Sequence, residues 1–318
     1  MWTTIEQIFP YAIIFMIPLL ITALGGLFSE RSGVVNIGLE GLMIVGSFVG
    51  AFVMLKLQES WTGHHGAAIW VGLLAAAAAG VLFSLLHAFA SVHLSANQVI
   101  SGTAINMIAG ALTVFLARNM TGSGNIRIAS GLRPFNVPGL SEIPILGPLF
   151  FTKSYLTTWV VLAIVAISAY VLRRTAFGLR LRACGEFPQA AEAAGVNVRR
   201  MRYVGVMISG AFAGLGGAIL LVTIAGEFTG NVAGLGFLAL AALIFGQWRP
   251  LGILGATAFF GIASTVANVS QVIPSLAAIP PVLLKVFPYV VTLIALVIFS
   301  KSSRAPKAAG EVFDSGKR

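Results

Sequence analysis

The sequence predicts an all-α protein, a polytopic bundle of transmembrane helices, and three observations predict it. Of the 318 residues, 58% are hydrophobic and only 9% are charged, whereas soluble domains carry about 25% charged residues. The mean hydropathy is +0.94. Apolar runs long enough to cross a bilayer recur along nearly the whole chain. We therefore expect one membrane domain over residues 1–300, followed by a disordered cytoplasmic tail over residues 301–318.

The apolar runs divide into about nine spans, and eight to ten are compatible with the pattern. The seventh is shorter than the roughly 20 residues of a full span, so we expect it to be tilted, or broken and buried. The first span lacks a basic flank and a cleavage site, which predicts a retained helix. The predicted spans are Ile8–Phe28, Val34–Leu55, Ala67–Ser91, Val99–Ala117, Tyr155–Leu172, Tyr203–Ala225, Gly234–Gly246, Gly252–Ser270 and Val282–Phe299.

Basic residues set the expected orientation. Seven arginines fall in residues 173–202, and placing this connection in the cytoplasm puts 14 basic residues inside and six outside. The excess predicts an external N-terminus and a cytoplasmic C-terminus in a bacterial plasma membrane. The net charge of +10 is not a nucleic-acid footprint, because the basic residues separate apolar segments and do not alternate with aromatic ones.

Two connections are longer than a hairpin requires. The external loop, residues 118–154, is rich in Gly, Pro, Ser and Asn and predicts irregular structure. The cytoplasmic loop, residues 173–202, contains a stretch in which Pro188 suits a first helical turn and Gly195 suits a helix end. From the residues alone, this short helix is either a docking element for another protein or a simple connector.

Several segments carry a resemblance to a known family. The cytoplasmic loop and the glycine-rich segment after it resemble the coupling region of ABC importer permeases of the branched-chain amino acid and simple-sugar superfamily. The segment Ser29–Gly41 is similar to the nucleoside branch of that superfamily. Residues 96–101 with Asn106 are similar to the Asn-Glu-Val-Ile pattern of the same branch, except that Gln98 stands where the branch usually has Glu. The segments that carry the resemblance are residues 29–41, 96–101 with Asn106, 185–196, 209–217, 234–237 and 246–250.

The resemblance implies the permease subunit of an ATP-binding-cassette importer for nucleosides. Its expected partners are a separate ATPase subunit, a second permease in a heterodimer, and an extracellular substrate-binding lipoprotein. The chain contains no phosphate-binding Gly-x-x-x-x-Gly-Lys-[Ser/Thr] loop, so we expect no ATPase activity and no cofactor. The residues expected to couple to the ATPase are Gly185, Glu186, Ala190, Ala191 and Gly195.

Polar residues within the spans are candidates for the substrate pathway. Glu40 is the only carboxylate well inside a predicted span, and it predicts either a pathway residue or a partner for broken backbone at Gly38 or Gly41. Amides inside membranes either line a pathway or join helices. Phe237 and Trp248 are further aromatic residues that could stack on a nucleobase. The pathway candidates are Asn36, Glu40, Phe48, Asn97, Gln98 and Asn106.

Other features favour structural roles. Gly46-x-x-x-Gly50 and Gly210-x-x-x-Gly214 predict closely packed helices. Cys184 is the only cysteine, and no paired-cysteine metal site can form. We expect no metal site and no catalytic cluster. Simple sugars or branched-chain amino acids are alternative substrates, and an ion-coupled secondary transporter is the alternative class, which would require more intramembrane acids or an inverted repeat.

Overall fold

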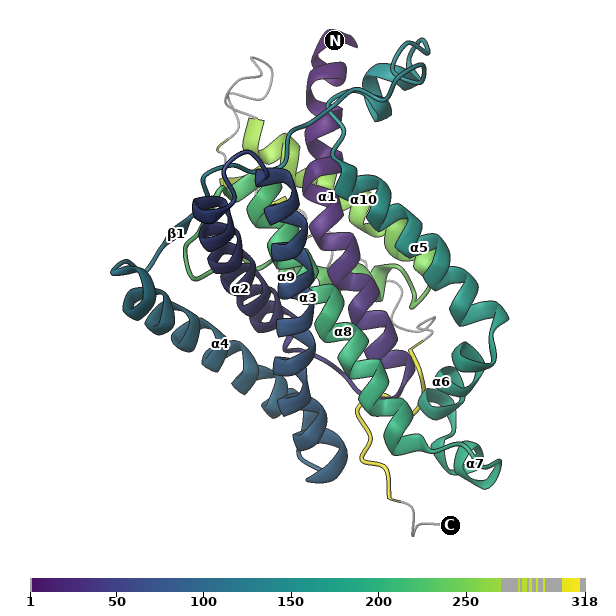
Figure 1. The fold of residues 1–318 in the computed structure, drawn as a ribbon. Helices are drawn as coiled ribbons and strands as arrows, with labels where there is room; N and C mark the ends of the chain where they lie inside the picture. The colour runs from purple at the N-terminus through teal and green to yellow at the C-terminus, as the bar shows by residue number, and fades with distance from the viewer. Residues whose placement is uncertain are drawn as a thin grey trace.

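The computed structural model describes residues 2–269, 280, 282–284, 286, 287, 290, 294 and 305–314. The described chain is mostly α-helical, as predicted (Figure 1). Two short strands, β1 (Ile126–Arg127) and β2 (Glu227–Phe228), pair antiparallel. The α-helices are α1 (Trp2–Arg31), α2 (Leu39–Ser60), α3 (His65–Ala88), α4 (Gln98–Thr121), α5 (Leu156–Arg174), α6 (Ala176–Glu186), α7 (Pro188–Ala193), α8 (Val198–Leu220), α9 (Leu235–Phe245) and α10 (Pro250–Val269), and the π-helical turns are η1 (Phe89–His93), η2 (Gly147–Phe151) and η3 (Leu221–Ala225).

Seven of the described helices are long and apolar enough to cross a membrane, and α9 is a shorter apolar helix. These eight helices correspond in order to the first eight predicted spans. The predicted ninth span, Val282–Phe299, falls largely outside the described residues. The all-α, multi-pass class is therefore confirmed, while the total of nine spans stays a prediction.

The centre of the bundle is formed by α1 and α8, which lie side by side (Figure 1). α1 is apolar around its whole circumference, a pattern typical of a helix surrounded by others. Its residues Leu19 to Leu24 are almost completely buried. In contrast, α4 leans away from the bundle and leaves Ile100, Met107 and Phe115 more than half exposed (Figure 1). The face of α4 is therefore available to lipid or to another subunit.

Glycines allow α2, α3 and α8 to pack with their backbones in contact. A Cβ atom at Gly46 of α2 would collide with the backbone of Gly214 in α8. A Cβ atom at Gly210 of α8 would collide with Gly80 O in α3. Both glycine motifs therefore mediate close helix packing, and this prediction is confirmed.

The start of α2 differs from the prediction. We expected the second span to begin at Val34, but α2 begins at Leu39 and residues 32–38 are irregular. α1 ends at Arg31, and Gly33 adopts a left-handed backbone with φ of +96°. The Ser29 hydroxyl donates to the Val34 carbonyl, 2.7 Å away. Local side-chain hydrogen bonds of this kind compete with helix formation, and hydropathy does not register them.

The first and last described residues lie at opposite ends of the bundle (Figure 1). α1 begins at one end, whereas α6, α7 and residues 305–314 lie at the other, which we call the α7 end (Figure 1). Residues 305–314 belong to the tail that was expected to be disordered. They pack on the loop: the Ala308 N–H donates to the Gly185 carbonyl at 2.8 Å, and the Gly310 N–H donates to the Gly33 carbonyl at 3.2 Å.

Candidate functional site

Buried amide side chains hold the irregular connection between α1 and α2. Asn36 Nδ2 donates to Ser209 Oγ in α8 at 2.9 Å, and Asn36 Oδ1 accepts from the Gly38 N–H at 3.0 Å. Gln98 Oε1 accepts from the Val35 N–H at 2.6 Å. Non-helical backbone inside a membrane protein must find polar partners. Two of the predicted pathway residues, Asn36 and Gln98, therefore bind and orient the main chain between α1 and α2.

Asn106 of α4 completes this arrangement. Its Oδ1 accepts from the Gly41 N–H at 2.7 Å, and its Nδ2 donates to the Ile37 carbonyl at 3.0 Å. One amide thus bridges the last irregular residues and the first turn of α2. The Nε2 of Gln98 is different, because it is buried and has no hydrogen-bond partner among the described residues.

Glu40 joins the first turn of α2 to the start of α9. Its Oε1 accepts from the Gly234 N–H at 2.9 Å, and its Oε2 accepts from the Gly236 N–H at 2.7 Å. The first N–H groups of a helix lack intrahelical partners and form its positive end, so a carboxylate is the natural cap. Gly236 has no side chain to prevent this contact, because a Cβ atom there would collide with the Glu40 backbone.

The broken backbone that Glu40 serves is therefore at Gly234, where φ is +76°, and not within α2. The structure thus gives the Glu40 carboxylate backbone partners 194 and 196 residues further along the chain, and a role for Glu40 in the substrate pathway stays a prediction. The short seventh span and the Gly-x-Gly at its start were the available signals. They did not indicate which acid would bind there.

The remaining candidates lie apart from this group. Asn97 is exposed and caps α4, where its Oδ1 accepts from the Val99 N–H at 2.9 Å. Phe48 is buried edge-to-face against Phe228, with ring centroids 5.6 Å apart. Phe237 is 50% exposed. The described structure thus brings Asn36, Gln98 and Asn106 around one connection, and does not place an aromatic stacking partner beside them.

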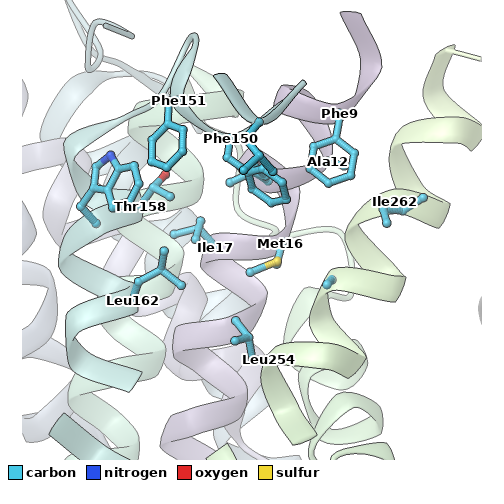
Figure 2. A pocket seen from close by; sticks show the side chains of 14 residues that line it. Phe9, Ala12, Met16, Ile17, Phe150, Phe151, Thr158, Leu162, Leu254 and Ile262 are labelled. Atoms are coloured by element: carbon cyan, nitrogen blue, oxygen red, sulfur yellow. The ribbon is translucent and has the colours of Figure 1, made fainter. Parts of the chain in front are cut away.

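A large apolar cavity occurs elsewhere, between α1, α5, α10 and η2 (Figure 2). It encloses about 470 Å³, and Figure 2 shows Phe9 and Met16 on one wall, Leu254 and Ile262 on another, and Phe150 above them. Thr158 and Trp159 are its only residues with polar side-chain atoms. A nucleoside carries several hydroxyl, amide or amine groups, each of which needs a partner when it is buried. This cavity is therefore unsuited to the expected substrate.

The loop at the α7 end contains the predicted short helix. α7 begins with Pro188 in its first turn and ends at Ala193, and Gly195 follows with φ of +81°. The helix predicted between Pro188 and Gly195 is confirmed. Its exposed face carries Ala190 and Ala193, whereas Ala191 points inward and is only 5% exposed.

The five predicted coupling residues separate into surface and buried positions. Ala190 and Gly195 are exposed, and Glu186 is partly exposed and lies 3.5 Å from Arg31. Gly185 is buried, and a Cβ atom there would collide with the Arg31 carbonyl. Ala191 packs in a small core with Cys184, Val198 and Phe313. Only the first three can contact a partner directly without rearrangement of the loop.

Phe187 is the loop residue that sequence reasoning missed. It immediately precedes α7, is 60% exposed, and has the Lys307 ammonium 5.6 Å from its ring centroid. An exposed aromatic side chain beside a small-residue helix is typical of an anchor at a protein interface. The available signal was a lone aromatic residue within a polar loop.

Residues 311–313 of the tail pack against Arg202, next to the loop that carries α7. The Arg202 side chain is fully buried, donates from one terminal nitrogen to the Glu311 carbonyl at 2.8 Å, and lies 5.7 Å from the Phe313 ring centroid. Its other two side-chain nitrogens have no hydrogen-bond partner among the described residues. Residues 311–313 thus cover a charge that water would otherwise solvate.

A second network links α1 to the turn before α10. The Trp248 indole N–H donates to a Glu30 carboxylate oxygen, and Arg31 donates to the Trp248 carbonyl at 2.8 Å. Trp248, a predicted stacking partner for a nucleobase, is therefore hydrogen-bonded to Glu30 and Arg31 at the end of α1.

Comparison with known proteins identifies the family of this chain. The family model of the branched-chain amino acid transport system permease component matches residues 8–296. The chain belongs to this family of permease components. It is 46% identical to the guanosine ABC transporter permease protein NupQ of Bacillus subtilis, over 98% of this chain and 97% of that protein.

Two further relatives are informative. The nucleoside ABC transporter permease protein NupC of Lactococcus lactis is 42% identical over 96% of each chain. The guanosine ABC transporter permease protein NupP of Bacillus subtilis is 28% identical over 81% of this chain and 70% of that protein. Bacillus subtilis thus has two relatives of this chain that are both named for guanosine but differ in their identity to this chain and in how much of their length it covers.

Proposed function

We propose that this chain is one of two permease subunits of an ABC importer that takes up nucleosides. The observation that carries the proposal is the full-length likeness to permeases named for guanosine and nucleosides. A second, longer permease forms the other half of the pathway, as the unequal Bacillus relatives suggest. A separate subunit hydrolyses ATP, and an external lipoprotein delivers the substrate.

The α7 end of the bundle faces the cytoplasm in this proposal. The arginine-rich loop and residues 305–314 lie there, in keeping with the excess of basic residues on the inner side of membrane proteins. The exposed surface made by Phe187, Ala190, Ala193 and Gly195 docks on the ATPase. Asn36, Glu40 and Asn106 border the pathway and position its backbone, and direct contact of the six pathway candidates with substrate stays a prediction.

Ala190→Trp tests the docking surface. Ala190 is exposed, so a bulky side chain there leaves the permease core intact but overpacks a complementary groove, which typically costs about 1–3 kcal/mol, or roughly 5- to 150-fold in affinity. We expect normal membrane insertion with parallel losses of ATPase co-purification and nucleoside uptake.

The same uptake assay tests the substrate. Ribose and glucose are added as competitors, because inhibition of nucleoside uptake by either sugar would indicate that the importer also accepts sugars.

The control is Ala67→Trp, an exposed position near the start of α3 at the opposite end of the bundle. Ala191→Trp is unsuitable, because its side chain would enter the core around Cys184 and Val198. Unchanged ATPase association in both Ala190→Trp and Ala193→Trp would show that α7 is only a connector.

Introduced cysteines test the orientation. A membrane-impermeant maleimide added to intact cells should label His64→Cys but should label Ala194→Cys only after permeabilisation. Both positions are exposed and lie at opposite ends. Native Cys184 can stay in place, because burial raises the pKa of its thiol to about 11, so the reactive thiolate is scarce near neutral pH. Labelling of Ala194→Cys in intact cells would reverse the proposed topology.

A further inference from the structure

A second pocket lies at the α7 end, between the ends of α1 and α5, the middle of α6 and the turn before α10. It encloses about 400 Å³, and four of its seven lining residues are arginines. The complete lining is Arg31, Leu172, Arg173, Arg182, Trp248, Arg249 and Pro250. Four arginines from four separate segments of the chain therefore line one concave site.

The positive charge of this pocket is only partly compensated. Arg31 lies 3.5 Å from Glu186, whose side chain is 41% exposed, so solvent screens this pair. Arg182 donates to the Gly178 carbonyl at 3.4 Å. Among the described residues, neither Arg173 nor Arg249 lies within ion-pair distance of a carboxylate. The other nearby acid, Glu30, accepts the Trp248 indole N–H.

The backbone around the pocket adds to its preference for an anion. α10 begins at Pro250, on the pocket wall, so the positive end of the dipole of this 20-residue helix lies at the pocket, although Pro250 has no N–H of its own to donate. Gln247 and Trp248 both have φ of +51°, a left-handed conformation that is costly for residues other than glycine. This strained turn places Arg249 beside the start of α10. Arginine side chains and a helix start are the groups that proteins commonly use to bind phosphate.

We infer that this pocket binds the phosphate headgroup of an anionic phospholipid from the inner leaflet. The inference rests on the proposed orientation, which places the α7 end in the cytoplasm. Arginine-lined pockets between membrane helices on that side are suited to such headgroups. The walls support a lipid: three are the ends of the membrane-spanning helices α1, α5 and α10, and Leu172 and Trp248 supply apolar surface beside the arginines.

The test compares lipid retention by variants of the complete importer, purified with its ATPase and second permease. Arg173→Gln/Arg249→Gln removes the two pocket charges that have no ion-pair partner and leaves Arg31 in its structural contacts. Arg180→Gln/Arg199→Gln is the control, because both arginines are exposed, lie outside the pocket lining, and represent the same change of charge. Each complex is equilibrated with an equal mixture of phosphatidylglycerol and phosphatidylcholine, and the retained lipids are counted by native mass spectrometry.

We expect the wild type and the control to retain phosphatidylglycerol preferentially, and the pocket variant to lose this preference by about 10-fold or more, since two charge-assisted contacts are removed. Equal losses in the pocket variant and the control would overturn the inference in favour of general surface charge. Displacement of the lipid by excess inorganic phosphate would overturn it in favour of a free anion. Loss of the ATPase from the pocket variant with lipid retention unchanged would assign these arginines to subunit docking instead.

Lipid counting does not depend on transport. Selective retention of phosphatidylglycerol by an importer that takes up no nucleoside would support the pocket and refute the proposed function. Nucleoside uptake without selective retention of phosphatidylglycerol would support the proposed function and refute the lipid site.

Discussion

Gly214→Leu is expected to remove most of the folded permease. Gly214 faces α3, where a Cβ atom would collide with the Ala76 carbonyl, and its own backbone occupies the space that Gly46 leaves in α2. Overpacking typically costs about 1–3 kcal/mol when side chains can yield. Here the colliding atoms belong to the main chains of neighbouring helices, so we expect a penalty at or above that range, within a total stability of about 5–15 kcal/mol.

The matched control for this substitution is Gly110→Leu. Gly110 is also a glycine inside a membrane helix, α4, but no atom lies near the Cβ position. The measurement is the yield of monodisperse protein by size-exclusion chromatography, together with the midpoint of thermal unfolding. Equal yields and midpoints for the two variants would mean that backbone contact between α2, α3 and α8 contributes little to stability.

Glu40→Ala is expected to detach the start of α9 from α2. The Gly234 and Gly236 N–H groups would lose the carboxylate oxygens that accept from them, and an unsatisfied buried donor costs about 1–3 kcal/mol. Glu40→Gln keeps one acceptor oxygen but turns an NH₂ group toward the other N–H, so its effect should be intermediate. We expect a lowered unfolding midpoint and slower nucleoside uptake in the order wild type, Gln, Ala.

Glu59→Ala is the control for this series. Glu59 lies on the same helix and pairs with Lys56 at 2.9 Å, but both side chains are 54% exposed. Exposed pairs of this kind contribute about 0–1 kcal/mol. An unfolding midpoint and uptake rate in Glu40→Ala equal to those of Glu59→Ala would show that α9 does not depend on its carboxylate cap.

The fold class and family could be predicted because their signals are local or compositional. Hydropathy located eight helices, and Pro188 and Gly195 marked the limits of α7 through their own backbone preferences. The same signals placed the start of the second span too early at Val34, because hydropathy does not include the hydrogen bond between Ser29 and the Val34 carbonyl.

The partners of the polar residues could not be predicted, since they depend on tertiary contacts. Glu40 was identified as an unusual acid within a predicted span, yet its partners are Gly234, just before α9, and Gly236 in its first turn, 194 and 196 residues away. The inward direction of Ala191 follows from packing against Val198 and Phe313. Nothing in the residues around Phe313 indicates that a polar tail would return to cover this surface.

The contacts of residues 305–314 also bear on how the protein is made. Gly33, Gly185 and Arg202 are synthesised well before their partners Gly310, Ala308 and Glu311, which follow more than 100 residues later in the chain. Since chains fold progressively from the N-terminus as they are synthesised, the membrane helices can insert long before the proposed docking surface is complete. A chain released early by the ribosome would leave the Arg202 guanidinium uncovered beside α7. If the ATPase docks on this surface as proposed, its binding would distinguish permeases that carry residues 305–314 from chains truncated before them.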